Sequence, residues 1–171
     1  AERAMRHCWW PVARSVDLAD GPAHAVLLDT PLAVFRGADG AARVLANRCP
    51  HRGGSLGHGV VHGNDLACPY HGWRYSGETG ACTRVPALAD PTRVPANAVV
   101  QTYPAVERYG HVWTCLEEPL VDMYDLDEWH DPQFEWLAAD PIVTDRGVAV
   151  AIENFRDVAH FPFVHAVSMG P

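Results

Sequence analysis

The amino-acid sequence predicts a mainly β protein, in which a small antiparallel β domain precedes the beginning of a second domain. Three observations support this fold class. Short apolar runs recur between residues 23 and 116, Gly-rich and Pro-rich connections separate them, and the composition becomes acidic and irregular after residue 118. Strand-length apolar runs between turn residues are typical of antiparallel sheets. We predict one complete domain over residues 1–118, and a linker with an incomplete second domain over residues 119–171.

The expected strands of the first domain follow one another at short intervals. They span residues 24–28, 32–35, 42–46, 65–68, 73–75, 99–103 and 111–116. Asp39-Gly40 separates the second of these strands from the third, and this dipeptide predicts a hairpin turn.

The second part of the chain carries fewer signals. Residues 142–152 are rich in β-branched side chains, which predicts one strand. Residues 153–159 are expected to be helical, and Pro162 is expected to stop that helix, because proline lacks the backbone N–H that a helix interior requires.

Composition excludes several classes of function. Thirteen basic residues, all of them Arg, stand against 21 acidic residues, for a net charge of −8. Such a chain repels phosphate backbones, so we expect no nucleic-acid binding. No uncharged apolar run approaches the ~18 residues of a membrane helix, and no secretory signal is visible. Five cysteines, an odd number, argue against a disulfide framework. We expect a cytoplasmic protein without membrane contact.

Two short segments each place one cysteine near one histidine. Cys49 and His51 form a C-x-H pair, and Cys68 and His71 form a C-x₂-H pair. Two thiolates and two imidazoles satisfy either a tetrahedral zinc ion or a [2Fe–2S] cluster with mixed ligands. Zinc fingers usually pair like ligands within one knuckle, so the mixed pairs favour the cluster. Replacing two thiolates by neutral imidazoles makes the oxidised cluster neutral, which raises its reduction potential.

A second group of candidate ligands lies near the end of the sequence, at Asp157, His160 and His165. Two imidazoles and one carboxylate are the usual ligands of Fe(II) in non-haem oxygenases. Asp157 and His160 are three residues apart and are expected on one face of a helical turn. His160 and His165 are about 140° apart on a regular helix, so a bend at Pro162 is needed to bring both to one metal. Taken alone, the pattern also fits two core or surface histidines.

Together the two groups resemble the catalytic subunit of the Rieske non-haem iron oxygenases. The resemblance rests on the four cluster ligands, their spacing and the flanking Pro, Gly and aromatic residues. Gly54 and Tyr70 stand where high-potential respiratory Rieske proteins carry a disulfide, and Trp73 stands where those proteins carry a Ser. The resemblance implies a Rieske [2Fe–2S] antiparallel β domain at residues 1–118, followed by the beginning of an α+β helix-grip catalytic domain, truncated in this sequence.

The resemblance also implies a role for each candidate site residue. Cys49 and Cys68 would bind one iron of the cluster, and His51 and His71 the other. His160 and His165 would bind a mononuclear Fe(II). Asp157 would be a bridging carboxylate directed towards a cluster histidine of a neighbouring subunit, and Asn154 would lie near the iron. The third iron ligand of the family is an acidic residue beyond this sequence, with Asp157 as the alternative.

The implied function is that of the oxygenase component of a multicomponent system. An NAD(P)H-dependent reductase or a ferredoxin would supply electrons, since no Gly-rich dinucleotide fingerprint is present. The mononuclear iron would activate O₂ to hydroxylate or demethylate a small organic, aromatic substrate, in a homotrimer. The alternative is a Rieske ferredoxin-like electron-transfer protein without catalysis, and a structural zinc module ranks third.

Overall fold

The computed structural model describes residues 2–136 and 142–169, and its contacts divide the chain into two compact units. We call residues up to Trp129 the sheet unit and residues from His130 onwards the helical unit. Each unit is described by itself. The domain limits expected from the sequence, 1–118 and 119–171, remain a prediction.

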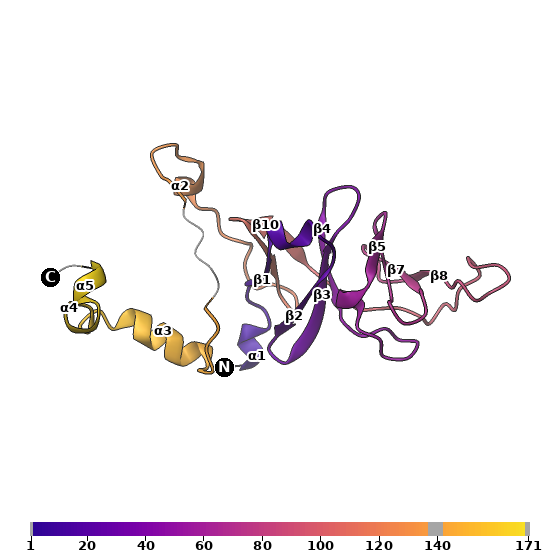
Figure 1. Cartoon of the computed structure of the whole chain (residues 1–171), viewed down its shortest axis with the longest axis horizontal. Coiled ribbons are helices and arrows are strands. Elements are labelled where there is room, and N and C mark those ends of the chain that lie inside the picture. Colours follow the sequence, from indigo (N-terminus) through magenta and orange to yellow (C-terminus); the bar gives the residue numbers. More distant parts are fainter. Residues whose placement is uncertain (1, 137–141, 170–171) are drawn as a thin grey trace. The chain divides into compact units, whose positions relative to one another are not determined.

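The sheet unit contains three antiparallel sheets (Figure 1). The first has the order β1 (Trp10–Arg14), β11 (His111–Thr114), β10 (Ala105–Arg108). The second, or middle sheet, has the order β2 (Ala23–Leu27), β3 (Thr30–Arg36), β4 (Ala42–Ala46), β9 (Thr102–Tyr103). The third has the order β5 (Val60–His62), β6 (Asp65–Ala67), β7 (Arg74–Ser76), β8 (Cys82–Arg84). The 3₁₀ helices η1 (Ser15–Leu18) and η2 (Leu56–His58) connect the sheets, the short helix α1 (Glu2–Met5) precedes β1, and α2 (Asp127–His130) follows β11. The mainly β, antiparallel fold class is confirmed.

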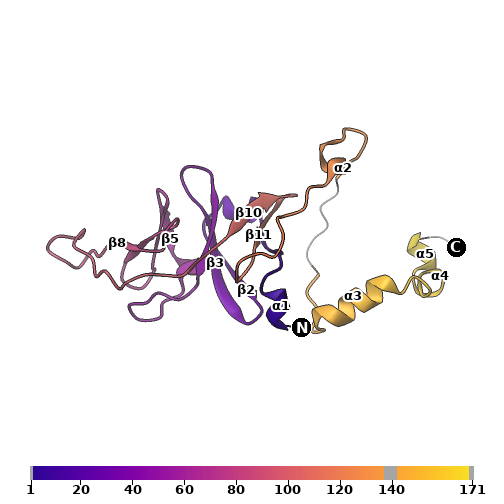
Figure 2. The ribbon, with the colours of Figure 1, turned by 180° about the vertical axis from the view of Figure 1, so that it is seen from behind.

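The middle sheet lies between the other two sheets (Figures 1 and 2), and its strand β3 is buried on both faces. Successive residues of a strand point to opposite faces. Leu32 and Val34 of β3 therefore pack into one core, and Ala33 and Phe35 into another. This double burial explains the uninterrupted apolar run in β3, since a strand covered on both sides needs no polar face. The second core also contains Cys49 and Cys68. Its other residues join the middle and third sheets: Leu45, Leu56, Leu66, Tyr75, Cys82, Val85, Ala98 and Val100.

Most predicted strands are confirmed to within about two residues at each end, with one clear exception. The strand expected over residues 99–103 is reduced to β9, Thr102–Tyr103. The segment before β9 bonds instead to the third sheet: Cys82 N–H donates to the Ala98 carbonyl, and Val100 N–H donates to the Gly80 carbonyl, both at 2.8 Å. The segment therefore crosses from the third sheet to the middle sheet and joins them.

The strand predicted over residues 142–152 is wrong. Residues from Val148 form α3 (Val148–Arg156), and residues 142–147 form no strand. Val148, Ala151, Ile152 and Phe155 recur at the i, i+3, i+4, i+7 spacing of one helix face. This helical spacing outweighs the high content of β-branched residues, because the preference of such residues for strands is weak.

Pro162 does not end the helix predicted over residues 153–159. The helix predicted over residues 153–159 stops at Arg156, and Asp157 is already extended, with φ −83° and ψ 92°. Pro162 lies in the first turn of a separate helix, α4 (Phe161–Val164), where its missing N–H has no intrahelical partner to lose. A further short helix, α5 (Ala166–Met169), follows. No helix within residues 2–136 and 142–169 has the length and apolar character of a membrane span.

Candidate cluster and iron sites

The two cysteine–histidine pairs lie in two loops with the same backbone arrangement. The first loop, residues 49–54, follows β4, and the second loop, residues 68–73, joins β6 to β7. In each loop the cysteine N–H donates to the carbonyl five residues on, and a glycine N–H four residues on donates to the cysteine carbonyl, at 2.8–2.9 Å. Those glycines, Gly53 and Gly72, have φ of 72° and 70°, a left-handed conformation that favours glycine.

In both loops the cysteine is buried and the histidine is more exposed to solvent. Cys49 and Cys68 are 2% and 3% exposed, whereas His51 is half-buried and His71 is exposed. Gly54 lets the two loops approach closely, because a Cβ at this position would lie 2.8 Å from the Cys68 Sγ. The two cysteines therefore lie near each other, and so do the rings of His51 and His71, although sixteen residues separate the two segments in the sequence.

His51 carries a buried nitrogen that no group in the described residues satisfies. Its Nδ1 is buried without a hydrogen-bond partner, although buried polar atoms are nearly always paired. The ring stacks on Trp73 with centroids 4.4 Å apart, and lies 4.7 Å from the ring of His71. Burial, followed by the nearby charges of His71 and Arg52, lowers the pKa of His51. The neutral imidazole is the form that binds a metal.

The residues fit a [2Fe–2S] cluster, because each loop offers one thiolate and one imidazole. Structural zinc requires four ligands around one ion. A Rieske cluster requires only two protein ligands on each iron, and an unpaired nitrogen on His51 suits that role.

Tyr75 is buried next to the first loop, and its contact with Cys49 could not be predicted from the sequence. Its hydroxyl lies 3.1 Å from the Cys49 Sγ, and the residue is fully buried. Burial raises the pKa of Tyr75, so the hydroxyl keeps its proton and would donate a hydrogen bond to the Cys49 sulfur when that sulfur is a thiolate. Burial also raises the pKa of the Cys68 thiol, against the opposing effect of the Tyr70 and His71 backbone N–H groups. Iron held by Cys68 would stabilise the thiolate through its positive charge.

Asn47, which precedes the first loop, forms hydrogen bonds with residues that follow this loop. Its Oδ1 accepts hydrogen bonds from the Gly57 N–H at 2.6 Å and from the Ser55 hydroxyl at 3.2 Å. Ser55 in turn contacts the His58 Nδ1 at 2.9 Å. Sequence analysis missed Asn47, because a single Asn before a cysteine gives no signal until its partners ten residues away are known.

The second candidate site is partly assembled in the helical unit. The Asp157 carboxylate accepts a hydrogen bond from the Ala159 N–H at 3.0 Å and lies 3.4 Å from the His160 Nδ1. The rings of His160 and His165 have centroids 5.3 Å apart. The prediction that Asp157 and His160 share a helical turn is wrong, since Asp157 follows the last residue of α3 and His160 precedes α4. The turn between the two helices brings them together instead.

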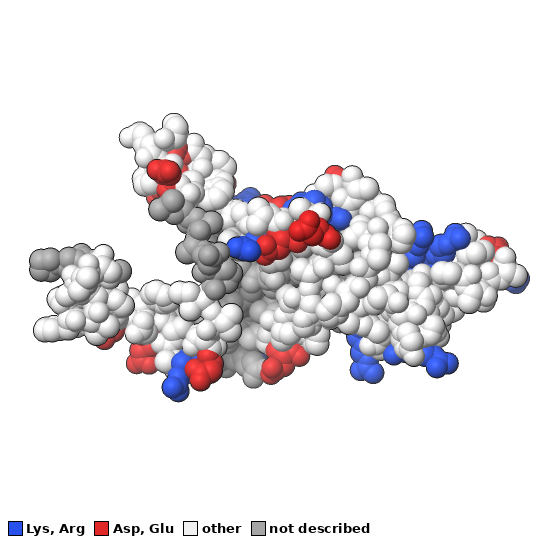
Figure 3. Space-filling model, viewed as in Figure 1, with Lys and Arg blue, Asp and Glu red and all other residues white. Residues whose placement is uncertain are grey.

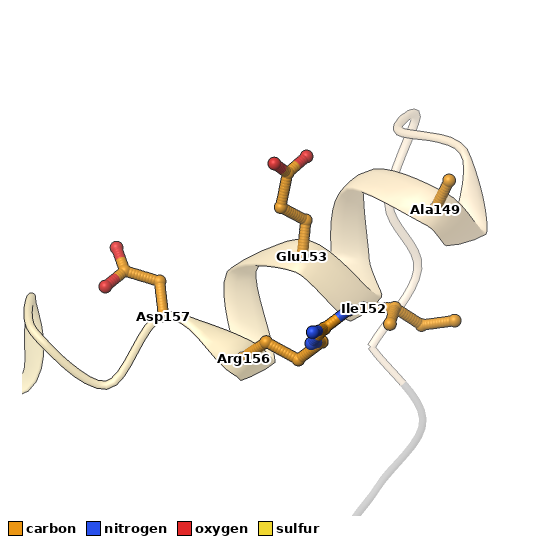
Figure 4. Close-up of a pocket in the computed structure, with 5 residues that line it drawn as sticks. All are labelled: Ala149, Ile152, Glu153, Arg156 and Asp157. Atoms are coloured by element: carbon orange, nitrogen blue, oxygen red, sulfur yellow. The ribbon is translucent and has the colours of Figure 1, made fainter.

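Asn154 and Asp157 line different surface pockets. Asn154 lines its pocket with Thr144, Val150 and Phe155, whereas Asp157 lines the other with Glu153 (Figure 4). The apolar face of α3 is exposed, and none of the described residues 142–168 is buried.

Comparison with known proteins identifies the class of the sheet unit. Residues 8–104 match the model of the Rieske [2Fe-2S] domain, so the chain belongs to this family. The confirmed class carries a [2Fe–2S] cluster.

Two proteins of Pseudomonas putida are among the similar sequences. Oxidoreductase NdmD is 44% identical over 113 residues, which are 65% of this chain and 19% of NdmD. Methylxanthine N1-demethylase NdmA is 34% identical over 169 residues, which are 94% of this chain and 47% of NdmA. The chain thus spans from a fifth to about half of the length of these curated relatives.

Solved structures agree with the sequence matches. NdmA superposes with a TM-score of 0.87 at 33% identity, covering 98% of this chain and 53% of that one. Dicamba monooxygenase bound to dicamba superposes with a TM-score of 0.84 at 32% identity, covering 94% and 48%. Both matches extend beyond residue 104, and the predicted resemblance to Rieske oxygenase subunits is confirmed.

Proposed function

We propose that Cys49 and Cys68 bind one iron of a Rieske cluster and that His51 and His71 bind the other. The observation that carries the proposal is the pair of equivalent loops, which sets two buried sulfurs beneath two neighbouring imidazoles. The unpaired Nδ1 of His51 supports it. When bound, the cluster supplies a one-electron redox centre.

The chain controls this centre through its own groups. Burial in the second core excludes water from the sulfurs, and the Tyr75 hydroxyl lies where it would donate a hydrogen bond to a Cys49 thiolate. Hydrogen bonds to cluster sulfurs raise the reduction potential, because they stabilise the more negative reduced state. The more exposed imidazole side offers the edge through which an electron enters and leaves.

We further propose that His160 and His165 bind a mononuclear Fe(II), which supplies O₂ activation when bound. Asp157 is suited to orient His160, because a carboxylate that accepts the Nδ1 proton leaves Nε2 free as the ligand. More than half of the Asp157 side chain is exposed, so it can accept a second hydrogen bond from a cluster histidine of a neighbouring subunit. Asn154 is proposed to lie near this iron as a secondary group.

The whole protein is proposed to act as the oxygenase component of a multicomponent system, as a homotrimer in the cytoplasm. It would take electrons from an NAD(P)H-dependent reductase or a ferredoxin and use O₂ to hydroxylate or demethylate a small aromatic substrate. The similarity to oxygenases over nearly the whole chain, beyond the Rieske domain, supports this function over that of a Rieske ferredoxin-like carrier. The names of the relatives, a methylxanthine demethylase and a dicamba monooxygenase, support the substrate class.

Metal and sulfide analysis tests the cluster. We expect the purified protein to contain iron and acid-labile sulfide and to show the visible absorbance of a [2Fe–2S] cluster. Cys68→Ala should abolish that absorbance. Cys115→Ala is the matched control, since Cys115 is equally buried but lies outside both loops. Zinc in place of iron and sulfide, or an intact cluster in Cys68→Ala, would contradict the assignment.

Oxygen consumption tests the activity. With a reductase and a panel of N-methyl and O-methyl aromatic compounds, O₂ uptake should be coupled to product formation. A protein whose cluster cycles between redox states without product would be an electron carrier instead.

A further inference from the structure

The turn between β10 and β11 contains a tyrosine in a conformation that tyrosine rarely adopts. Tyr109 and Gly110 form the two-residue loop of this hairpin, since Arg108 is the register partner of His111. Tyr109 has φ 56° and Gly110 has φ 71°. Loops of this kind favour Asn-Gly, and a bulky side chain at positive φ is strained. Such strain persists where the surrounding structure imposes it, and it is concentrated at functional positions.

The Tyr109 hydroxyl is bonded to a segment that follows the hairpin in the chain. We call residues 119–129, the last residues of the sheet unit, the exit segment. The hydroxyl donates to the Tyr124 carbonyl at 2.9 Å and accepts from the Leu126 N–H at 2.8 Å. The Tyr109 ring stacks on that of Tyr124 with centroids 5.6 Å apart, and lies edge-on to Trp129 at 5.2 Å. One side chain therefore contacts the exit segment at three positions.

The neighbouring Arg108 contacts the same segment. Its guanidinium donates to the carbonyls of Met123 and Tyr124 at 3.2 and 3.0 Å. The same group lies 3.7 Å from the Asp125 carboxylate. The exit segment contains four acidic residues and no basic residue, and Figure 3 shows acidic side chains on the part of the chain around α2. Arg108 therefore adds both hydrogen bonds and the opposite charge.

Apolar packing holds the exit segment only weakly. Within residues 119–129 only Met123 is buried, and regular structure begins only with α2 at Asp127. Trp9 holds the start of the segment, because its Nε1–H donates to the Val121 carbonyl at 3.0 Å. Segments with little apolar burial open easily. The position of residues 123–129 therefore depends on the contacts made by the hairpin turn.

The helical unit, which carries His160 and His165, follows the exit segment directly in the chain. We propose that Tyr109 is a positioning residue, which fixes where the chain leaves the sheet unit and thereby the geometry for electron transfer to the candidate iron. One electron leaves the reduced cluster and reaches this iron, and no bond is made or broken. This inference rests on the proposed function, since it requires both metal sites.

Two substitutions separate the hydroxyl from the turn. Tyr109→Phe keeps the ring and the strained turn but removes both hydrogen bonds. Tyr109→Asn removes the contacts of the side chain and gives the loop its preferred Asn-Gly sequence, so the hairpin is retained. Tyr124→Phe is the matched control. It removes a hydroxyl from the same group of rings, and no hydrogen bond from that hydroxyl occurs among the described residues.

Hydrogen-exchange mass spectrometry of the full-length protein tests the contacts without turnover. In Tyr109→Phe, amides of the exit segment should exchange at least about fivefold faster, because two hydrogen bonds are lost. Tyr109→Asn should show an effect at least as large. Tyr124→Phe should stay within about twofold of wild type, because it loses no hydrogen bond.

Rapid mixing tests the positioning role. The full-length protein, loaded with both metals and reduced at the cluster, is mixed with O₂ and with the methylated aromatic compound that supports O₂ uptake. Reoxidation of the cluster should slow about tenfold in both Tyr109 variants, since misplacement by 1 Å costs up to about 100-fold. The absorbance and potential of the cluster should stay unchanged. An unchanged potential separates this effect from a general loss of structure.

Four results would overturn the inference. They are wild-type exchange in both Tyr109 variants, faster exchange with wild-type reoxidation, an equal loss in Tyr124→Phe, or wild-type behaviour in Tyr109→Asn alone, which would assign the effect to backbone strain. A wild-type protein with a protected exit segment, whose reduced cluster is not reoxidised with any compound of the panel, would refute the proposed function and with it the positioning role. The contacts of Tyr109 with the segment would then stand by themselves.

Discussion

Tyr75→Phe should lower the reduction potential of the cluster. The substitution removes one hydroxyl and keeps the ring that fills the buried position. The lost hydrogen bond spans 3.1 Å to the Cys49 Sγ. Hydrogen bonds to charged groups contribute about 1.5–3 kcal/mol, and we assign about 1 kcal/mol to the difference between the reduced and the oxidised cluster. For a one-electron couple this corresponds to a decrease of about 43 mV.

A potentiometric titration followed by visible absorbance measures this shift. Tyr103→Phe is the matched control, because Tyr103 packs against the other core and no hydrogen bond from its hydroxyl occurs among the described residues. Its potential should stay within about 10 mV of wild type. An unchanged potential in Tyr75→Phe, or an equal shift in both variants, would refute the assignment of Cys49 as a cluster ligand hydrogen-bonded to Tyr75.

Four further predictions concern ligands, electron transfer and pH. His71→Cys should lower the potential towards that of all-cysteine clusters, because a thiolate adds negative charge; titration of any cluster that assembles checks the direction. His160→Ala should lose the mononuclear iron and keep the visible absorbance of the cluster, as metal analysis would show. Asp157→Asn should retain both metal sites but slow single-turnover reoxidation of the reduced cluster by O₂ and substrate about 10–100-fold, measured by rapid mixing. The Arg36 guanidinium lowers the pKa of Glu107 below 4.5, so this pair stabilises the fold above pH 4.5 and the stabilisation is lost as the pH falls through the lowered pKa. Glu107→Gln should therefore show a smaller decrease in Tm than wild type between about pH 5 and 3.

Strand positions were predictable where short apolar runs end at distinctive turn residues. The Asp39-Gly40 turn lies between β3 and β4 as expected, with Gly40 at φ 83°. The hairpin between β2 and β3 turns through Leu28 and Asp29, both at positive φ. Leucine rarely adopts this conformation, so no local signal marks the turn, and only the pairing of the two strands imposes it.

The helical unit shows the limit of composition as a guide. The β-branched residues of segment 142–152 favour a strand, yet Val148 and Ile152 belong to α3. Intrinsic preferences of about 1 kcal/mol or less are overridden when the apolar residues follow a helical period.

The sequence by itself determined the chemistry of the cluster site, because ligand type and spacing are local properties of the chain. Cys49 with His51 and Cys68 with His71 identify the class before any fold is known. Tertiary structure alone decided what surrounds them. The Tyr75 hydroxyl beside Cys49 and the buried nitrogen of His51 depend on how the strands and loops pack. The physical reason is that burial and hydrogen bonding arise between segments distant in the chain, and no local pattern of residues encodes them.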